Sequence, residues 1–193
     1  MNPDSSLPMS ELEYKKLFIG ASLPESYLST IQDFIGEFPD ERAIRVVPKE
    51  NLHLTVAFFG KVQVEMIPNL MSLIQLCLKD IRPFSLEVDR WKLAPKAKDP
   101  RMVWLSMKRS EQFTALAHQL IRSFDQIQPT QQFRLKPIPH ITIARFRDSA
   151  IAKEVSLDFS VPSDPLLIDK LILWESVLLP DGPVYTEVEL FSL

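Results

Sequence analysis

The chain has 193 residues, 46% of them hydrophobic, and a net charge of −3. A chain of this length buries a core without disulfides or metals, so one domain over 15–193 behind a loose tail over 1–14 is expected. The net negative charge argues against a general nucleic-acid coat protein. The single cysteine, Cys77, lies in an apolar pattern typical of a core thiol in a reducing compartment. Without a signal-like N-terminus or 18 successive apolar residues, we expect a cytoplasmic protein that does not span a membrane.

The first half of the chain begins with a predicted strand over 16–21. Ser22 and Glu25 have the spacing of a capping box, which predicts a helix that ends near Phe38. A short strand over 44–47 and a strand over 51–59, closed by Gly60, follow. An amphipathic helix is predicted over 64–78, and alternation over 84–94 predicts a strand with one face in water.

The second half follows a basic loop over 95–100. Hydrophobic periodicity predicts strands over 101–107 and 138–146, with a helix over 111–127 between them. Two last strands are predicted over 166–174 and 185–191, joined by a turn over 180–183. The chain thus alternates strands and helices from end to end, which indicates one mixed α and β architecture.

The stretch 51–59 returns in altered form as 138–146. Each matching pair is 87 positions apart, namely His53 with His140, Thr55 with Thr142, Ala57 with Ala144 and Phe59 with Phe146. In a strand, residues two apart share a face and their Cα atoms lie about 6.5–7 Å apart. Each histidine and its threonine can therefore reach one tetrahedral anion together.

A single His-x-Thr triplet has little specificity, since a half-buried strand often carries polar residues on its wet face. Two such triplets with a matching four-position pattern are more specific than one. A matching strand segment also lies upstream of each triplet. The strand at 16–19 lies as far before His53 as 103–106 lies before His140. We therefore expect an α+β fold in which a β-α-β unit is duplicated about a pseudo-two-fold axis. Two antiparallel or mixed sheets flanked by helices would form two lobes, with the wet faces of the His-x-Thr strands meeting across a central cleft.

Two imidazoles and two hydroxyls in one small volume suit general acid–base catalysis on a phosphate. The unperturbed pKa of histidine, about 6.5, lets one ring be neutral and the other cationic. Threonine hydroxyls can donate to oxygens whose charge grows in the transition state. Three histidines and one cysteine make a poor zinc inventory, and no Gly-rich phosphate loop is present, so neither metal nor cofactor is expected.

These motifs resemble a known family. His53-Leu-Thr-Val56 and His140-Ile-Thr-Ile143 are similar to the paired H-x-T-x motifs of the 2H phosphoesterase superfamily. The wider pattern resembles the RNA 2′,3′-cyclic phosphodiesterases, once called 2′-5′ RNA ligases. It includes the segments 16–19, 45–53, 100–104, 140–145, 173–176 and 182–185.

The resemblance implies roles for five residues. His53 would donate a proton to the leaving oxygen, and His140 would accept one from water; the residues alone leave the two interchangeable. Thr55 and Thr142 would hold the phosphate. The family also places an arginine, here Arg145, near the phosphate, although strict strand alternation turns position 145 away from His140. Only a bulge or the end of the strand would bring Arg145 back.

The implied activity is metal-independent hydrolysis of RNA 2′,3′-cyclic phosphate ends, or of a related nucleotide, to 2′-phosphomonoesters. A monomer is expected, with no DNA partner. ATP-independent 2′-5′ ligation of RNA, a non-catalytic RNA-end or nucleotide binder and a purely structural domain stay open as alternatives. Phe18, Trp104 and Tyr185 are candidates to stack on a base, or else core aromatics.

Overall fold

The computed structural model describes residues 13–38, 44–96, 98–128, 137–180 and 182–193. Of the tail expected over 1–14, only Glu13 and Tyr14 lie within these residues, and Tyr14 already belongs to the first strand. The strands are β1 (Tyr14–Ser22), β2 (Ile44–Val46), β3 (His53–Gln63), β4 (Phe84–Leu86), β5 (Val88–Lys96), β6 (Asp99–Met107), β7 (His140–Phe146), β8 (Leu166–Ile168), β9 (Lys170–Leu179) and β10 (Gly182–Ser192). The helices are α1 (Glu25–Gly36), α2 (Ile67–Leu78), α3 (Glu111–Ile127) and α4 (Ser149–Glu154), with 3-10 turns at Lys49–Asn51 and Val64–Met66.

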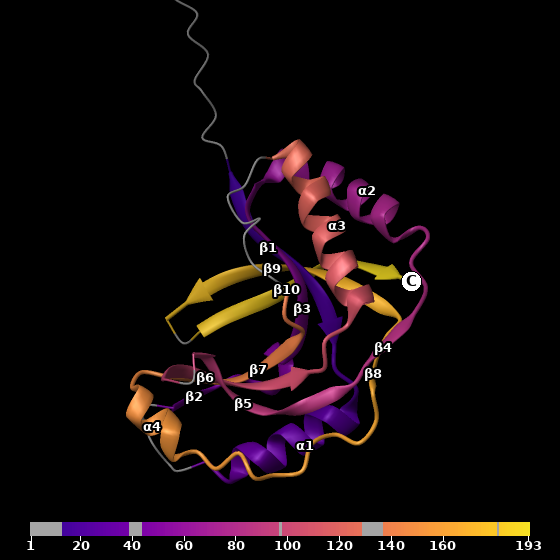
Figure 1. The fold of residues 1–193 in the computed structure, drawn as a ribbon. Helices are drawn as coiled ribbons and strands as arrows, with labels where there is room; N and C mark the ends of the chain where they lie inside the picture. The colour runs from indigo at the N-terminus through magenta and orange to yellow at the C-terminus, as the bar shows by residue number, and fades with distance from the viewer. Residues whose placement is uncertain (1–12, 39–43, 97, 129–136, 181) are drawn as a thin grey trace, which may run out of the picture.

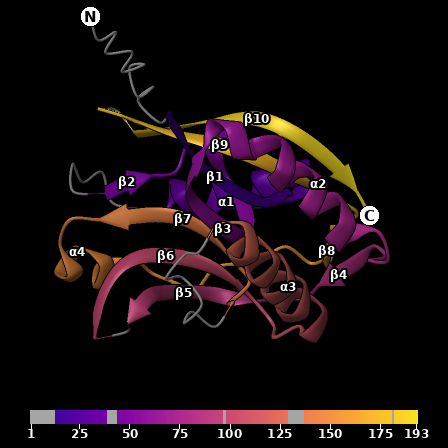
Figure 2. The same cartoon turned by 90° about the horizontal axis from the view of Figure 1, so that it is seen from above.

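In the described part of the chain, the strands form a large eight-stranded sheet and a small two-stranded one. The large sheet has the order β10-β9-β1-β3-β7-β6-β5, with β2 paired to β7 beside β3, while β4 pairs with β8. Neighbours run antiparallel throughout. Figure 2 shows β9 and β10 along one side, β5 and β6 along the other, and β1 and β3 between them. The α+β prediction with antiparallel sheets and helices is therefore confirmed.

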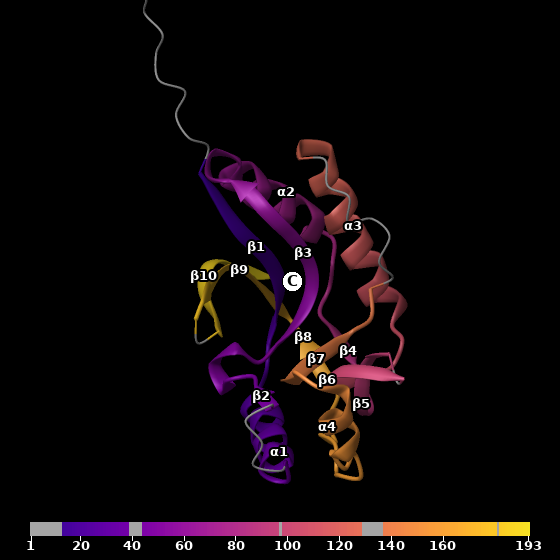
Figure 3. The same cartoon turned by 90° about the vertical axis from the view of Figure 1, so that its left-hand side faces the viewer.

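The helices lie at the two ends of the molecule, and aromatic side chains on α1 and α3 contact strands of the large sheet. Figures 1 and 3 both show α2 and α3 at one end of the molecule and α1 with α4 at the other. The ring of Phe124 on α3 lies 4.9 Å from that of Phe59 on β3. On α1, the ring of Phe34 stacks at 3.9 Å on Trp91 of β5. One continuous hydrophobic core contains residues of both halves.

Several predicted boundaries match the structure. The helix predicted over 111–127 is α3, whose Phe113, Leu116, Leu120 and Phe124 are buried. Cys77 is buried on α2, as predicted for a core thiol. Within the described residues, no helix is long and apolar enough to cross a bilayer.

Other local predictions are wrong for identifiable reasons. Ser22 does not cap α1, because it still belongs to β1 and pairs with His53; Pro24 precedes the helix without a side-chain cap. The strand predicted over 84–94 divides at Glu87, because Phe84–Leu86 pairs with β8 while the following residues pair with β6. The basic loop is the end of the β5–β6 hairpin, in which Lys96 pairs with Asp99. Gly60 does not end its strand but bends it, with φ of 75°.

Candidate active site

The two His-x-Thr segments lie on β3 and β7, which are neighbours at the centre of the sheet. Leu54 pairs with Ile141 in antiparallel register, and both side chains are fully buried. This register sets His53 across from Thr142 and Thr55 across from His140, on the face opposite Leu54 and Ile141. Directly opposed side chains start about 5 Å apart and diagonal ones about 7–8 Å apart. The strands therefore bring both imidazoles together side by side, rather than facing each other from two separate sheets.

Each histidine ring is fixed by the same backbone contact. His53 Nδ1 lies 2.7 Å from the carbonyl oxygen of Asn51, and His140 Nδ1 lies 2.7 Å from that of Ile138. A carbonyl can only accept, so Nδ1 carries hydrogen in both rings and Nε2 of a neutral ring keeps its lone pair. The Nε2 atom of His53 is 3.0 Å from Thr55 Oγ1, a hydroxyl that can donate to it.

Aromatic side chains pack against the imidazole rings of both histidines. Trp104 on β6 stacks on His140 with centroids 3.8 Å apart and planes 25° apart. His53 lies in a cluster with Phe18, Trp174 and Tyr185, at centroid distances of 4.8, 5.7 and 5.2 Å. Phe18 is only 3% exposed. Phe18 and Trp104 therefore pack against the histidines, which limits the orientations that the imidazoles can adopt.

A β-bulge turns Arg145 toward the histidines. Trp104 pairs with Thr142 and Val103 pairs with Ala144, so Ile143 is an extra residue on β7. The bulge shifts the alternation of side chains by one position, which returns position 145 to the face of His140 and Thr142. Arg145 is exposed, its Nη1 lies 3.1 Å from Met102 Sδ, and its charge acts on both imidazoles. The sequence had indicated that only a bulge or the end of the strand could bring Arg145 to the histidine face, and the structure contains such a bulge.

The first repeat contains the matching bulge. On β3, Thr55 pairs with Gly20 and Ala57 pairs with Ile19, which leaves Val56 as the extra residue, 87 positions before Ile143. The counterpart of Arg145 is then Phe58, an aromatic side chain that is 45% exposed on the histidine face. Sequence reasoning missed Phe58, because strict alternation in the predicted strand turns it away from His53.

The upstream strands are equivalent, but their register differs from the one predicted. Ser22 pairs with His53 as Ser106 pairs with His140, an offset of 84 positions rather than 87. The connection from this strand residue to the motif histidine is thus three residues shorter in the first repeat (53 − 22 = 31) than in the second (140 − 106 = 34). The sequence correctly predicted that the strands containing 16–19 and 103–106 are equivalent in the two repeats. The predicted alignment of these two strands was wrong by three residues.

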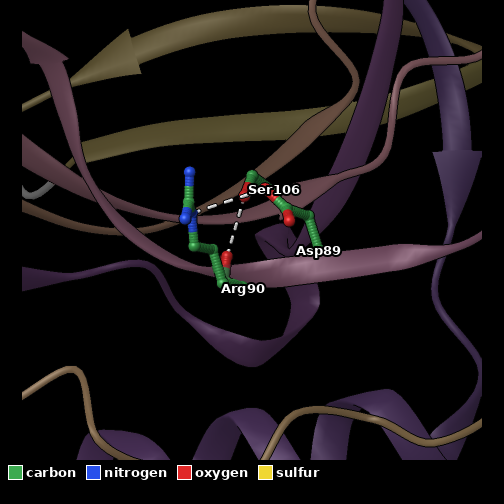
Figure 4. A network of polar contacts seen from close by, with 3 residues as sticks. All are labelled: Asp89, Arg90 and Ser106. Atoms are coloured by element: carbon green, nitrogen blue, oxygen red, sulfur yellow. Dashed lines mark hydrogen bonds and ion pairs between the residues drawn. The ribbon is translucent and has the colours of Figure 1, made fainter.

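Ser106 anchors the strand that lies beside His140. Its Oγ lies 2.9 Å from the carbonyl oxygen of Arg90 and 3.3 Å from Asp89 Oδ2, and Arg90 Nε lies 3.5 Å from the same carboxylate (Figure 4). Ser106 is buried, with 5% of its surface exposed. These contacts tie β6 to β5 at the point where β6 supports His140.

Asn51 is a further residue of the site that sequence reasoning did not single out. Its carbonyl oxygen orients His53, and its Nδ2 donates to the carbonyl oxygen of Pro183 at 2.8 Å. A buried amide two residues before the motif histidine is a weak signal, because its partner is 132 positions away in sequence. Only the fold shows that Asn51 ties β3 to the β9–β10 hairpin.

Burial lowers the pKa of both histidines. For His53 and for His140 the largest effect is desolvation, which disfavours the charged ring, and the hydrogen bond to the backbone carbonyl opposes it. The positive charge of Arg145 lowers both pKa values further, and a charge on His140 also lowers the pKa of His53. Both rings therefore favour the neutral form at neutral pH until an anion enters the site.

The groups that gather here are imidazoles, hydroxyls and one guanidinium. Over the residues that the structure describes, no three His, Cys, Asp or Glu side chains cluster closely enough to hold a metal ion. Hydroxyl and guanidinium donors suit the oxygens of a phosphate, and a neutral Nε2 suits the acceptance of a proton. The arrangement fits acid–base chemistry on a phosphate ester.

Comparison with known families agrees with this chemistry. The model of the 2′-5′ RNA ligase superfamily matches residues 26–177. The chain belongs to this superfamily. Its curated relatives include proteins named RNA 2′,3′-cyclic phosphodiesterase. The one from Methanothermobacter thermautotrophicus is 26% identical over 187 residues, which cover 92% of this chain and 98% of that protein. The one from Thermus thermophilus is 29% identical and covers 92% and 90%.

Solved structures of the superfamily share this fold. The crystal structure of a protein from Thermus thermophilus superposes with a TM-score of 0.81 at 27% identity, covering 92% of this chain and 97% of its own. LigT from E. coli, in a complex with phosphate, gives a TM-score of 0.66 at 26% identity, with coverage of 94% and 98%. The complex of LigT with 3′-AMP gives 0.68 at 25% identity, with coverage of 94% and 99%.

Proposed function

We propose that this member of the superfamily hydrolyses RNA 2′,3′-cyclic phosphate ends to 2′-phosphomonoesters, without a metal. One observation carries the proposal: β3 and β7 are paired at Leu54 and Ile141, so that two His-x-Thr sets share one face of the sheet. The names of the curated relatives support the substrate class. Both histidines come from one copy of the chain, so a monomer is competent for the reaction.

The mechanism has two proton transfers, one at each ring. The Nε2 of neutral His140 accepts a proton from water, whose oxygen attacks phosphorus. The bond from phosphorus to the ribose O3′ breaks, and the Nε2–H of protonated His53 donates to that oxygen. Thr55, Thr142 and Arg145 donate to the non-bridging oxygens as their charge grows. The assignment of donor and acceptor follows the family resemblance, while the contacts at Nδ1 support Nε2 as the reacting atom in both rings.

The decisive experiment offers an RNA oligonucleotide with a 2′,3′-cyclic phosphate end in the presence of EDTA. We expect full conversion to the 2′-phosphomonoester, because no step uses a metal. Loss of activity in EDTA, or a 3′-phosphate product, contradicts the mechanism. Addition of a second RNA with a 5′-hydroxyl end tests the ligase alternative, in which that hydroxyl replaces water as the nucleophile.

The pH profile tests the division of roles. One neutral and one protonated ring give a bell in kcat/KM centred midway between the two pKa values of the pair. Burial and Arg145 lower both pKa values, so we expect an optimum below pH ~6.5, the ordinary histidine value. Replacement of Arg145 with methionine removes a positive charge and should move the bell toward higher pH.

In kcat the bell should lie at higher pH than in kcat/KM, because the bound phosphate anion favours protonated imidazole. Initial rates between about pH 4.5 and 9 would check both statements. A flat profile would mean that the two histidines do not act as an acid and a base. An optimum above about pH 7.5 in kcat/KM would mean instead that the free protein does not lower their pKa values.

A further inference from the structure

Two arginines face each other beside the histidines. In the pairing of β2 with β7, Arg45 lies directly opposite Arg145. Like charges directly opposite each other in a sheet are destabilising. Within the described parts of the chain, neither guanidinium forms an ion pair with a carboxylate. Arg145 Nη1 lies 3.1 Å from Met102 Sδ on β6, so both guanidinium charges are left for a bound anion.

A groove opens between these arginines and the β9–β10 hairpin. Its volume is about 270 Å³, and its walls include Arg45, Pro48, Asn51, Arg145, Leu178 and Pro183. Small-molecule sites begin at about 300 Å³, so the groove has room for a part of a nucleotide. The groove shares two residues with the histidine site: Asn51 orients His53 through its carbonyl, and the charge of Arg145 acts on both imidazoles. Its lining thus combines two guanidiniums with apolar side chains.

The side chain of Arg45 is exposed, and its guanidinium lies beside the hairpin at Gly182. A Cβ at Gly182 would collide with the Arg45 guanidinium, so the glycine leaves the space that this group occupies. Gly182 has φ of 138°, which side chains rarely permit. The bond from Asn51 Nδ2 to the Pro183 carbonyl holds the hairpin in place.

We propose that Arg45 forms a second phosphate subsite, with Arg145 shared between this subsite and the cyclic phosphate, and that the subsite takes the phosphate on the 5′ side of the terminal nucleotide. The inference rests on the proposed function, which places the cyclic phosphate between His53 and His140. Arg145 lies next along the same face of β7, and Arg45 follows on β2. The planar guanidinium fork matches phosphate oxygens. The enzyme therefore selects the end of an RNA chain over a bare nucleoside 2′,3′-cyclic phosphate.

Matched substrates with the same terminal base test the subsite. They are a nucleoside cyclic phosphate with a 5′-hydroxyl, the same compound with a 5′-phosphate, a dinucleotide, and a dinucleotide whose linkage is a neutral methylphosphonate. We expect the dinucleotide to exceed the bare nucleoside in kcat/KM by about tenfold, the effect of one charge-assisted hydrogen bond. The methylphosphonate should lose this advantage. A gain for the 5′-phosphate alone would identify a site for terminal phosphates and overturn the inference about RNA.

Arg45→Met should abolish the advantage of the dinucleotide and leave kcat/KM for the bare nucleoside unchanged. Arg45→Lys, which keeps the charge without the fork, should retain part of it. Arg122→Met is the matched control, because Arg122 lies on α3, away from the groove. Equal loss on both substrates, or no loss on either, contradicts the subsite.

Equilibrium binding keeps this test independent of turnover. The affinity of a 2′-phosphorylated dinucleotide should fall with salt more steeply than that of a nucleoside 2′-phosphate, with a log–log slope larger by about 0.7 for one extra phosphate contact. Arg45→Met should remove that difference. If the wild-type protein hydrolyses none of the substrates, the proposed activity fails, while these slopes still decide whether the subsite exists.

Discussion

His53→Ala and His140→Ala are each expected to lower kcat for a cyclic phosphate oligonucleotide by about 10²–10⁴, because each removes one proton-transfer group. Among the described residues beside the two rings, the other polar side chains are those of Asn51, the two motif threonines, Arg145 and Tyr185. None of them changes protonation readily near neutral pH, and burial raises the pKa of Tyr185 above its ordinary value. The loss should appear in kcat more than in KM, because the phosphate donors are retained. Single-turnover rates and product analysis would measure it.

His118→Ala is the matched control, since His118 lies on α3, outside the sheet face that carries the other two histidines. Its rate should equal that of the wild type. The double variant His53→Ala/His140→Ala should be only slightly slower than either single variant, because groups that act as a unit are not additive. A near-normal rate in either single variant would remove that histidine from the mechanism. A loss of binding equal to the loss of rate would indicate structural damage instead.

The sequence was sufficient for the part of the site that depends on short-range periodicity. The 87-residue repeat placed His53, Thr55, His140 and Thr142 on strands, and alternation put each pair on one face. That inference needs only the two-residue period of a strand. The β3–β7 pairing then supplied what periodicity lacks, namely that the two strands are neighbours.

The rest depended on irregularities that leave little trace in one sequence. The extra residues Val56 and Ile143 reset the alternation, which brings Phe58 and Arg145 to the histidine face. The apolar pattern does not reveal these bulges, because each extra residue is followed by a buried alanine, Ala57 or Ala144, whose small side chain could equally lie on the exposed face of an alternating strand. Arg45 is paired with Arg145 because β2 joins β7 at the point where β3 diverges from it. This pairing is a long-range contact that the local sequence pattern does not indicate.

Gly20→Ala should cost about 1–3 kcal/mol of the free energy of unfolding, the range of an overpacked core site. Gly20 pairs with Thr55. A Cβ there would overlap the Leu54 carbonyl oxygen and lie 3.1 Å from the Leu54 carbonyl carbon and 3.2 Å from Thr55 Cα. All three are backbone atoms, which cannot rotate away, so β1 and β3 must separate. Urea denaturation would measure the loss.

Activity should fall with stability in this variant, because the same backbone carries the His-x-Thr face. A displacement of about 1 Å at a catalytic group can cost about 10²-fold in rate. We therefore expect Gly20→Ala to lower kcat even at temperatures where it stays folded, with a larger loss than from a comparably destabilising change far from β3.

Gly36→Ala is the control that distinguishes the steric clash at position 20 from the general effect of replacing glycine with alanine. Gly36 ends α1, and an added Cβ there meets no atom within 4 Å. Alanine also restricts the unfolded chain, so this variant should be unchanged or more stable by about 0.5–1 kcal/mol. If the two variants behaved alike, the close approach of β1 to β3 would not be what requires glycine at position 20. Opposite signs would show that this approach sets the geometry of the first histidine strand.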